Sequence, residues 1–331
     1  MPADRSSTGV RTPYGARMVS VGSYLPERVV PVAEAAADYG VDPEWVLKRT
    51  QVAERHFAAE GETVSAMVVE ASKIALERAG VAADEIDLIL LGTSTAEYQC
   101  PGSSTIVQDA LGATGAGALD IGAACTGWLA GVSLAAAMIE AGRAETVLVT
   151  GAEIVSQLLG PDDVSAGLLM ADGAGAVVMR RSAPDETGIG PAVIHAEGQY
   201  ADLVTAVRVH PEHGRPIFTM SGQETYTVAV RSLVDATREV LELAGDELDD
   251  IDLFVYHQAN GRILRAVGDR LQLPPEKTIS IVERTGNTSA ASIPIALDDA
   301  YAAGRLVPGQ KVLMAAVGAG FVTAAAIVTW G

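Results

Sequence analysis

The chain has 331 residues, of which 49% are hydrophobic and only 5% aromatic, and this suffices for a large core or for two packed halves. A formal net charge of −19 excludes non-specific binding to nucleic acid or to an anionic membrane surface. The only cysteines are Cys100 and Cys125, and no Cys/His spacing is typical of a zinc site, so we expect neither a disulfide scaffold nor a metal and favour a reducing cytoplasm.

The predicted elements alternate between strands and helices along the chain. Residues 1–16 are polar, lack the apolar core of a signal peptide and are predicted to form a flexible tail. Two uncharged runs, 121–139 and 312–331, are interrupted by glycines and are interpreted as buried elements of a soluble fold, not as membrane spans. Strands are predicted at 17–22, 86–92, 146–151, 174–180, 252–256, 311–317 and 323–330, and helices at 63–79, 102–111, 125–141, 222–244, 259–271 and 290–303.

An internal duplication organises these elements into two halves. The helix–turn–strand segment "ALERAGVAADEIDLILLG" at 75–92 is similar to "VLELAGDELDDIDLFVYH" at 240–257, with an offset of 165 residues. A second pair, "AGRAETVLVTG" at 141–151 and "AGRLVPGQKVLMAAVG" at 303–318, has the same offset. We therefore predict two α/β halves, 17–182 and 183–331, joined by a polar link near 181–190.

Three polar residues stand at corresponding strand ends and helix entrances of these halves. Cys125, in "DIGAACTGWLAGV", begins a predicted helix whose dipole favours the thiolate, although a small buried structural cysteine is an equally good interpretation of the segment alone. His257 follows an apolar strand and Asn287 precedes a helix; a loop histidine and a helix N-cap are the ordinary alternatives. The pair of histidines in "HPEH" at 210–213 lacks further ligands, and we reject a metal site there.

Taken in order, these motifs resemble the thiolase superfamily, and within it the 3-oxoacyl-acyl-carrier-protein synthase III (ketoacyl synthase III) group. The resemblance begins at about residue 17, reaches the end of the chain and includes "GSYLPERVV" at 22–30, "EWVLKRT" at 44–50, "AACTGW" at 123–128, "ADGAGA" at 171–176, "HQAN" at 257–260, "GNTSAASIP" at 286–294 and "GAGF" at 318–321. It implies an α/β, five-layered αβαβα subunit of two duplicated halves, paired as a homodimer.

The resemblance also implies a role for each site residue. Cys125 attacks an acyl thioester, and its N–H together with one from Ala319 forms the oxyanion hole. His257 and Asn287 donate hydrogen bonds to the carbonyl of a malonyl-type thioester. Further residues implied to contact the acyl, pantetheine or nucleotide parts of the substrate are Trp45, Arg49, Arg262, Ala259, Cys100, Tyr226 and Val317. No metal, nicotinamide or flavin is required; acyl-coenzyme A or an acyl carrier protein is the substrate, and the carrier protein is an expected partner.

Several positions depart from the family pattern. Val164 stands where an arginine usually completes the adenine clamp with Trp45, and Ala319 replaces a glycine near the oxyanion hole. Val317 stands where a phenylalanine is common. Cys100, before Pro101, and Tyr226 replace large apolar residues, Cys100 at a position that lines the acyl pocket of the partner subunit.

These departures favour an enzyme of polyketide or other specialised metabolism over a housekeeping starter of fatty-acid synthesis. The leading hypothesis is decarboxylative condensation of an acyl group held on Cys125. One alternative is acyl transfer to a natural-product hydroxyl or amine without carbon–carbon bond formation. A non-catalytic dimer partner is the third, and the retention of Cys125, His257 and Asn287 argues against it.

Overall fold

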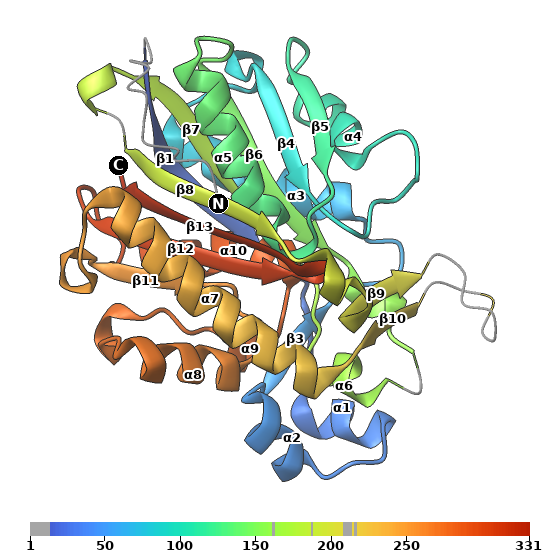
Figure 1. The fold of residues 1–331 in the computed structure, drawn as a ribbon. Coiled ribbons are helices and arrows are strands. Elements are labelled where there is room, and N and C mark those ends of the chain that lie inside the picture. Colours follow the sequence, from blue (N-terminus) through green and yellow to red (C-terminus); the bar gives the residue numbers. More distant parts are fainter. Residues whose placement is uncertain (1–13, 161–162, 187, 208–213, 215–216) are drawn as a thin grey trace.

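Two β-sheets form the centre of the computed structural model, which describes residues 14–160, 163–186, 188–207, 214 and 217–331 (Figure 1). The first sheet contains, in spatial order, β1 (Gly15–Tyr24), β7 (Gly173–Ser182), β6 (Thr146–Glu153), β4 (Leu88–Gly92) and β5 (Gly117–Ile121). The second contains β11 (Leu253–Tyr256), β12 (Lys311–Gly318), β13 (Val322–Thr329) and β8 (Ile189–Ala196). In both sheets, parallel strands in the middle or at one edge are joined to antiparallel neighbours.

Helices fill the space between the sheets and cover their outer faces. Between the sheets lie α5 (Gly127–Glu140) and α10 (Ser292–Ala302). Outside the first sheet lie α3 (Val64–Ala79) and α4 (Ser103–Leu111), and outside the second lie α7 (Gly222–Ala244) and α8 (Gly261–Leu271). The result is the predicted five-layered αβαβα arrangement. Helix α5 is uncharged up to Glu140 because it is buried between two sheets, and no described helix is long and apolar enough to cross a membrane.

The predicted offset of 165 residues holds in three dimensions. Leu88 of β4 pairs with Val147 of β6, and Leu253 of β11 pairs with Val312 of β12 in the same parallel register. The turns that precede the two central helices also correspond: η2 (Ala124–Thr126) leads into α5 and η8 (Ser289–Ala291) leads into α10. Their first residues share a rare backbone conformation, with φ of 47° at Ala124 and 51° at Ser289.

Glycines at the ends of two neighbouring strands allow these turns to meet. Gly92 of β4 pairs with Gly151 of β6. A Cβ atom at Gly92 would lie 2.5 Å from the carbonyl carbon of Gly127, and one at Gly151 would lie 2.4 Å from the carbonyl oxygen of Ala290. The absence of side chains at both positions thus places the beginnings of α5 and α10 side by side at one edge of the first sheet.

Shorter elements, not predicted from the sequence, surround this meeting point. They are β2 (Arg28–Pro31), α1 (Val32–Asp38), α2 (Pro43–Thr50), β3 (Glu54–Phe57), α6 (Val164–Gly167), β9 (Val204–Val207), β10 (Ile217–Met220) and α9 (Val282–Thr285). Strand β1 begins at Gly15, so the last two residues of the segment predicted as a tail belong to the first sheet. Residues 1–13 and the "HPEH" segment at 210–213 lie outside the described residues.

We expect Gly151→Ala to lower the free energy of unfolding by about 1–3 kcal/mol, because the new methyl group would overlap backbone atoms that cannot move independently. Chemical denaturation monitored by circular dichroism measures the change. Gly268→Ala is the matched control: a Cβ there, within α8, would meet nothing within 4 Å, and we expect a gain of about 0.5–1 kcal/mol. Equal effects of the two substitutions would contradict the close approach at Gly151.

Candidate active site

A single cavity brings together the three polar residues singled out in the sequence. It has a volume of about 1020 Å³ and is lined by Cys125, His257 and Asn287. Its walls come from α2, α6, the β9–β10 hairpin and the beginnings of α7 and α8. The residues that line it include groups from both halves of the duplicated fold, as the correspondence of strand ends and helix entrances predicts.

Cys125 lies in the turn η2, immediately before α5, with its backbone N–H facing the loop after β12. A Cβ at Gly318 would lie 2.9 Å from the Cys125 nitrogen, so the loop approaches this N–H because residue 318 has no side chain. Ala319 follows and lines the same cavity. The oxyanion hole predicted for Cys125 and Ala319 stays a prediction.

The Cys125 thiol is held protonated by its surroundings. Burial raises its pKa to about 11; the hydrogen bond that the Ser289 hydroxyl donates to Sγ at 3.3 Å opposes this shift, and the charge of Glu153 adds to it. The sequence analysis expects the α5 dipole to favour the thiolate, but burial outweighs that effect. An acceptor for the thiol proton is therefore needed before the sulfur can attack a substrate.

His257 is a neutral, anchored imidazole. It follows β11, is 1% exposed and has a pKa lowered to about 4 by burial. Its Nδ1 lies 2.6 Å from the Ser292 hydroxyl oxygen, which also accepts the N–H of Gln258. Because Ser292 already accepts one hydrogen bond, we infer that its O–H is donated to Nδ1, which leaves the ring proton on Nε2.

Asn287 presents an amide that is oriented by its own backbone turn. Its backbone joins Leu169 and Ala171 through two hydrogen bonds, and its side-chain Oδ1 accepts the Ser289 N–H at 2.9 Å. With the oxygen held in this way, Nδ2 is the group left to donate into the cavity. Gly286, at φ 65°, allows the approach: a Cβ there would lie 2.9 Å from the Ala171 side chain.

Two further buried residues, Glu153 and Ser289, adjoin the site and were not found from the sequence. The Ser289 hydroxyl lies 3.1 Å from Glu153 Oε1 as well as within hydrogen-bond distance of Cys125 Sγ. Burial raises the pKa of Glu153 to about 7, and hydrogen bonds from the Thr95 hydroxyl and the Ser94 N–H oppose that shift. The available signals were the single charge that ends the apolar strand "TVLVTGAE" and the offset of 165 that relates Ser289 to Ala124.

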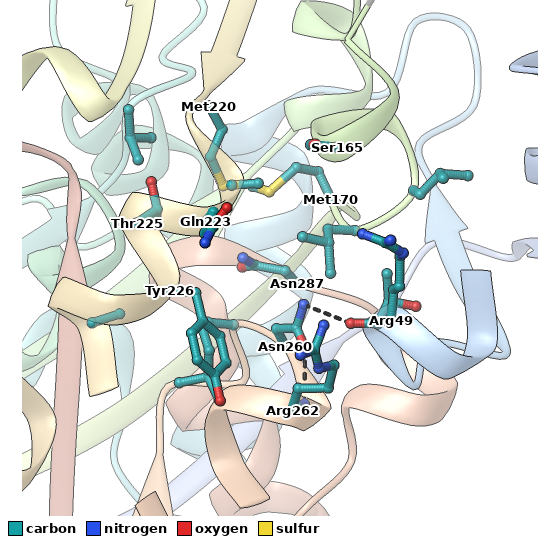
Figure 2. A pocket seen from close by; sticks show the side chains of 18 of the residues that line it. Arg49, Ser165, Met170, Met220, Gln223, Thr225, Tyr226, Asn260, Arg262 and Asn287 are labelled. Carbon is teal, nitrogen blue, oxygen red and sulfur yellow. Dashed lines mark hydrogen bonds between the residues drawn. The ribbon is translucent and has the colours of Figure 1, made fainter. Parts of the chain in front are cut away.

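Basic residues lie at the mouth of the cavity, on α2 and at the beginning of α8. The Arg49 guanidinium lies 4.4 Å from the centre of the Trp45 ring, and the Arg262 guanidinium lies 5.5 Å from the centre of the Tyr226 ring. Figure 2 shows Asn260 between Arg49 and Arg262, with its side chain donating to the Arg49 carbonyl and accepting the Arg262 N–H. Two helices from different parts of the chain are thereby joined at the mouth.

The remaining residues predicted for substrate binding fall into two groups. Ala259 and Val317 line the cavity, as does Val164, the residue in place of the adenine-clamp arginine. Cys100 does not line it; it is exposed on the loop between β4 and α4. Within the described ranges, no group of three or more His, Cys, Asp or Glu side chains is placed to hold a metal ion.

Comparison with known proteins agrees with this geometry. The family described as 3-oxoacyl-[acyl-carrier-protein (ACP)] synthase III matches residues 119–198, and its C-terminal part matches residues 241–330. A β-ketoacyl-[acyl-carrier-protein] synthase III of Bordetella petrii is 43% identical over 318 residues, covering 94% of each chain. One from Streptomyces coelicolor is 38% identical, over 95% of this chain and 96% of that protein.

Solved structures agree as well. The crystal structure of 3-oxoacyl-[acyl-carrier-protein] synthase III from Aquifex aeolicus superposes with a TM-score of 0.90 at 38% identity, covering 96% of this chain and all of that one (100%). The priming β-ketosynthase from the R1128 polyketide biosynthetic pathway superposes with a TM-score of 0.92 at 37% identity, covering 97% and 98%.

The fold and these likenesses define an acyltransferase of the thiolase-like class. Within that class, the chain belongs to the 3-oxoacyl-acyl-carrier-protein synthase III family.

The buried neutral His257 predicts a pH-dependent contribution to stability. An imidazole whose pKa falls from 6.5 to about 4 on folding binds fewer protons in the folded state, so stability is lost as the pH falls from about 6.5 to about 4. The loss approaches about 3 kcal/mol at pH 4. The raised pKa of Glu153 acts with the opposite sign, because that group binds more protons when folded.

We therefore expect the difference in unfolding free energy between wild type and His257→Gln to decrease as the pH is lowered from 7 to 4.5. Denaturation curves of both proteins at each pH measure it, and taking the difference cancels the contribution of Glu153. Parallel pH profiles for the two proteins would show that His257 titrates alike in the folded and unfolded chains.

Proposed function

We propose that this enzyme loads an acyl group from a coenzyme A or carrier-protein thioester onto Cys125 and condenses it with a malonyl-type thioester, with loss of carbon dioxide. The observation that supports this most directly is the convergence of a thiol, a neutral imidazole and an oriented amide on one cavity. The thiol supplies a nucleophile, and the other two groups supply hydrogen-bond donors with no charge of their own.

In the loading step, Cys125 Sγ attacks the carbonyl carbon of the thioester. The charge that develops on the carbonyl oxygen would be stabilised by the N–H groups of Cys125 and Ala319. The closeness of the Gly318 loop to the Cys125 nitrogen supports this pairing. Expulsion of the donor thiolate leaves the acyl group on the enzyme as a thioester.

In the condensation step, His257 and Asn287 act on the second thioester. Loss of carbon dioxide leaves an enolate, whose oxygen would accept hydrogen bonds from His257 Nε2–H and Asn287 Nδ2. The hydrogen bond between Ser292 and Nδ1 supports this tautomer, and the low pKa of His257 keeps the ring from protonating the enolate. The enolate carbon then attacks the acyl-cysteine and forms the new carbon–carbon bond, with Cys125 leaving as a thiolate.

The walls of the cavity favour a role in specialised metabolism. Val317 and Val164 are smaller than the phenylalanine and arginine that the family resemblance implies at these positions, and both line the cavity of about 1020 Å³. A cavity of that size accommodates a pantetheine arm together with an acyl group larger than acetyl. The R1128 priming β-ketosynthase, a similar chain, is named for a polyketide pathway, which supports the same assignment.

A homodimer and a carrier protein are the partners that we propose. Exposed apolar side chains at Tyr98, Leu119 and Leu134 lie on the loop after β4, the edge strand β5 and helix α5, where a second copy would cover them. This arrangement would carry Cys100 to the cavity of the partner. Lys48, Arg49 and Arg262 at the mouth give a locally basic surface for an acidic carrier protein despite the net negative charge.

Loading and condensation are expected to separate in variants. Wild type incubated with a panel of acyl-coenzyme A and acyl-carrier donors should gain the mass of one acyl group, and Cys125→Ala should gain none. His257→Ala and Asn287→Ala should still load, but condensation should fall by about 100-fold or more because each loses an enolate-stabilising donor. Intact-mass spectrometry measures loading, and release of carbon dioxide with a ketoacyl product measures condensation.

Two outcomes would overturn the proposal. If no donor loads the wild type, or loading persists in Cys125→Ala, the acyl-cysteine is wrong. If loading occurs but the acyl group moves only to a hydroxyl or amine acceptor, without release of carbon dioxide, the enzyme is an ester- or amide-forming acyltransferase.

The preferred donor can be tested at Val164. We expect Val164→Arg to lower the KM for acyl-coenzyme A about tenfold, because a guanidinium there would stack on adenine, whereas the KM for the acyl-carrier donor should not change. Val164→Met is the control of similar length without charge. Steady-state loading with each donor measures the effect, and an equal change for both donors would contradict a nucleotide-specific contact.

A further inference from the structure

A chain of two hydrogen bonds connects the Cys125 sulfur to a buried carboxylate. Ser289 Oγ lies 3.3 Å from Cys125 Sγ and 3.1 Å from Glu153 Oε1. A serine hydroxyl has one proton, so it can donate to only one of these atoms at a time. When it donates to the carboxylate, its oxygen is free to accept the thiol proton; when it donates to sulfur, it stabilises a thiolate.

Glu153 has no structural need for a charge at its position. It is the last residue of β6 and is fully buried, at 0% exposed. Its oxygens accept the Ser94 N–H at 3.1 Å and the Thr95 hydroxyl at 2.6 Å, and no Lys or Arg among the described residues pairs with it. A carboxylate without a cation is costly to bury, so its presence beside the nucleophile calls for a chemical role.

We propose that Glu153 accepts the proton of Cys125 through the Ser289 hydroxyl when the thiol is acylated, and returns it when the product leaves. This inference rests on the proposed acyl-cysteine chemistry and adds a proton acceptor to it. Ser289 touches the reacting sulfur, whereas Glu153 acts through Ser289.

The proton is conserved through both half-reactions. During loading, the S–H bond breaks as the sulfur bonds to the acyl carbon; the proton passes to Ser289 Oγ while the proton of Ser289 passes to Glu153, which becomes a neutral acid. The donor leaves as a thiolate and takes a proton from water. During condensation, the bond between sulfur and the acyl carbon breaks and Cys125 leaves as a thiolate. The proton on Glu153 then returns through Ser289 to sulfur, which restores thiol and carboxylate.

This route keeps the number of buried charges constant. The carboxylate loses its negative charge as the sulfur gains one, so the low-polarity surroundings that raise both pKa values do not oppose the transfer. His257 is a poorer acceptor because its Nδ1 is engaged by Ser292 and its pKa is lowered to about 4. Within the part of the chain that the structure describes, Ser289 is the one side chain that hydrogen-bonds to the Cys125 sulfur.

The other titratable groups near this chain have partners of their own. On the loop after β4, Glu97 accepts hydrogen bonds from Ser103 and from the Ser65 N–H. Before β7, Asp172 accepts from Ser156 and the Ala58 N–H. Neither contacts Glu153, which leaves Cys125 and, across the cavity, His257 as the groups whose charge bears on it.

The first test is the rate of acyl loading in Glu153→Gln, measured at pH 7.5 in a single turnover by quenched-flow mass spectrometry. We expect a fall of about 100-fold, because the amide keeps the shape of the side chain but cannot take up a proton. The sign is decisive. If Glu153 acted only as a nearby negative charge, its removal would lower the pKa of Cys125 and loading would be as fast as in wild type or faster, which would overturn the proposal.

The second test does not depend on any acyl donor and so remains informative if the proposed function fails. Alkylation of Cys125 by iodoacetamide is followed from pH 5.5 to 9.5 by peptide mass spectrometry, with the exposed Cys100 in the same molecule as internal reference. In wild type the Cys125 rate should level off above about pH 7, where Glu153 ionises, because the thiolate then forms by internal proton transfer. In Glu153→Gln it should rise about tenfold per pH unit throughout, and profiles of the same shape would contradict the coupling.

A double-mutant cycle shows whether Glu153 acts through Ser289. Ser289→Ala should slow loading as Glu153→Gln does, and the double variant should be no slower than either single variant. Alanine suits the backbone at 289, because Ala124 has the corresponding conformation in the other half. Additive losses would mean independent roles and would overturn the relay.

The matched control is Glu97→Gln, a second partly buried glutamate that accepts a serine hydroxyl and a backbone N–H without contact with Cys125. We expect wild-type loading and a wild-type alkylation profile from it. Near-wild-type circular dichroism of each variant excludes misfolding, and Glu153→Asp, which keeps the acid but shortens the chain, should recover part of the levelling-off that Glu153→Gln loses.

Discussion

The active site depends on the close backbone contact at the ends of β4 and β6. Gly92 and Gly151 leave no room for a methyl group against the turns that begin α5 and α10. Because the two turns derive from duplicated halves, their contact places Cys125 of one half beside Ser289 of the other. The thiol, its hydroxyl partner and the carboxylate beneath them are thus positioned by buried backbone of the two sheets and their central helices.

This position has an electrostatic consequence: the inner end of the cavity disfavours charge of either sign. Burial raises the pKa values of Cys125 and Glu153 and lowers that of His257, so each group is driven towards its neutral form. Such a site is well suited to a reaction whose anions exist only transiently, since oriented donors stabilise them more effectively here than in water. It also makes internal proton transfer preferable to exchange with solvent.

Much of this arrangement could be predicted from the sequence because it follows from periodicity and repetition. The offset of 165 residues predicted the register of the central strands, and the family motifs pointed to Cys125, His257 and Asn287. The local pattern around Cys125 could not separate a nucleophile from a buried structural thiol, since both need small uncharged neighbours. The helix dipole suggested a thiolate, and only burial, a property of the assembled layers, showed that the proton stays on sulfur.

Ser289 and Glu153 could not be assigned from the sequence for a related reason. Each is an ordinary residue in its own segment: a serine in a turn and a glutamate at the end of a strand. Their significance arises from a contact between residues 136 positions apart, which the packing of α10 against β6 creates. Long-range pairs of this kind leave no local pattern, and the short elements around the cavity, such as α2 and the β9–β10 hairpin, were missed because they lack a periodic apolar face.

The departures from the family pattern acquire a common meaning from their location. Val164, Val317 and Tyr226 all line the cavity, whereas the donors at its inner end are held by backbone and hydroxyl contacts that these side chains do not make. Changing a wall residue alters which acyl group or carrier fits, through volume and contact area. It does not alter the hydrogen bonds that stabilise an oxyanion or an enolate. The geometry therefore allows substrate choice to change while the chemical steps stay the same, and this separation is the physical basis for assigning a family reaction to a different substrate.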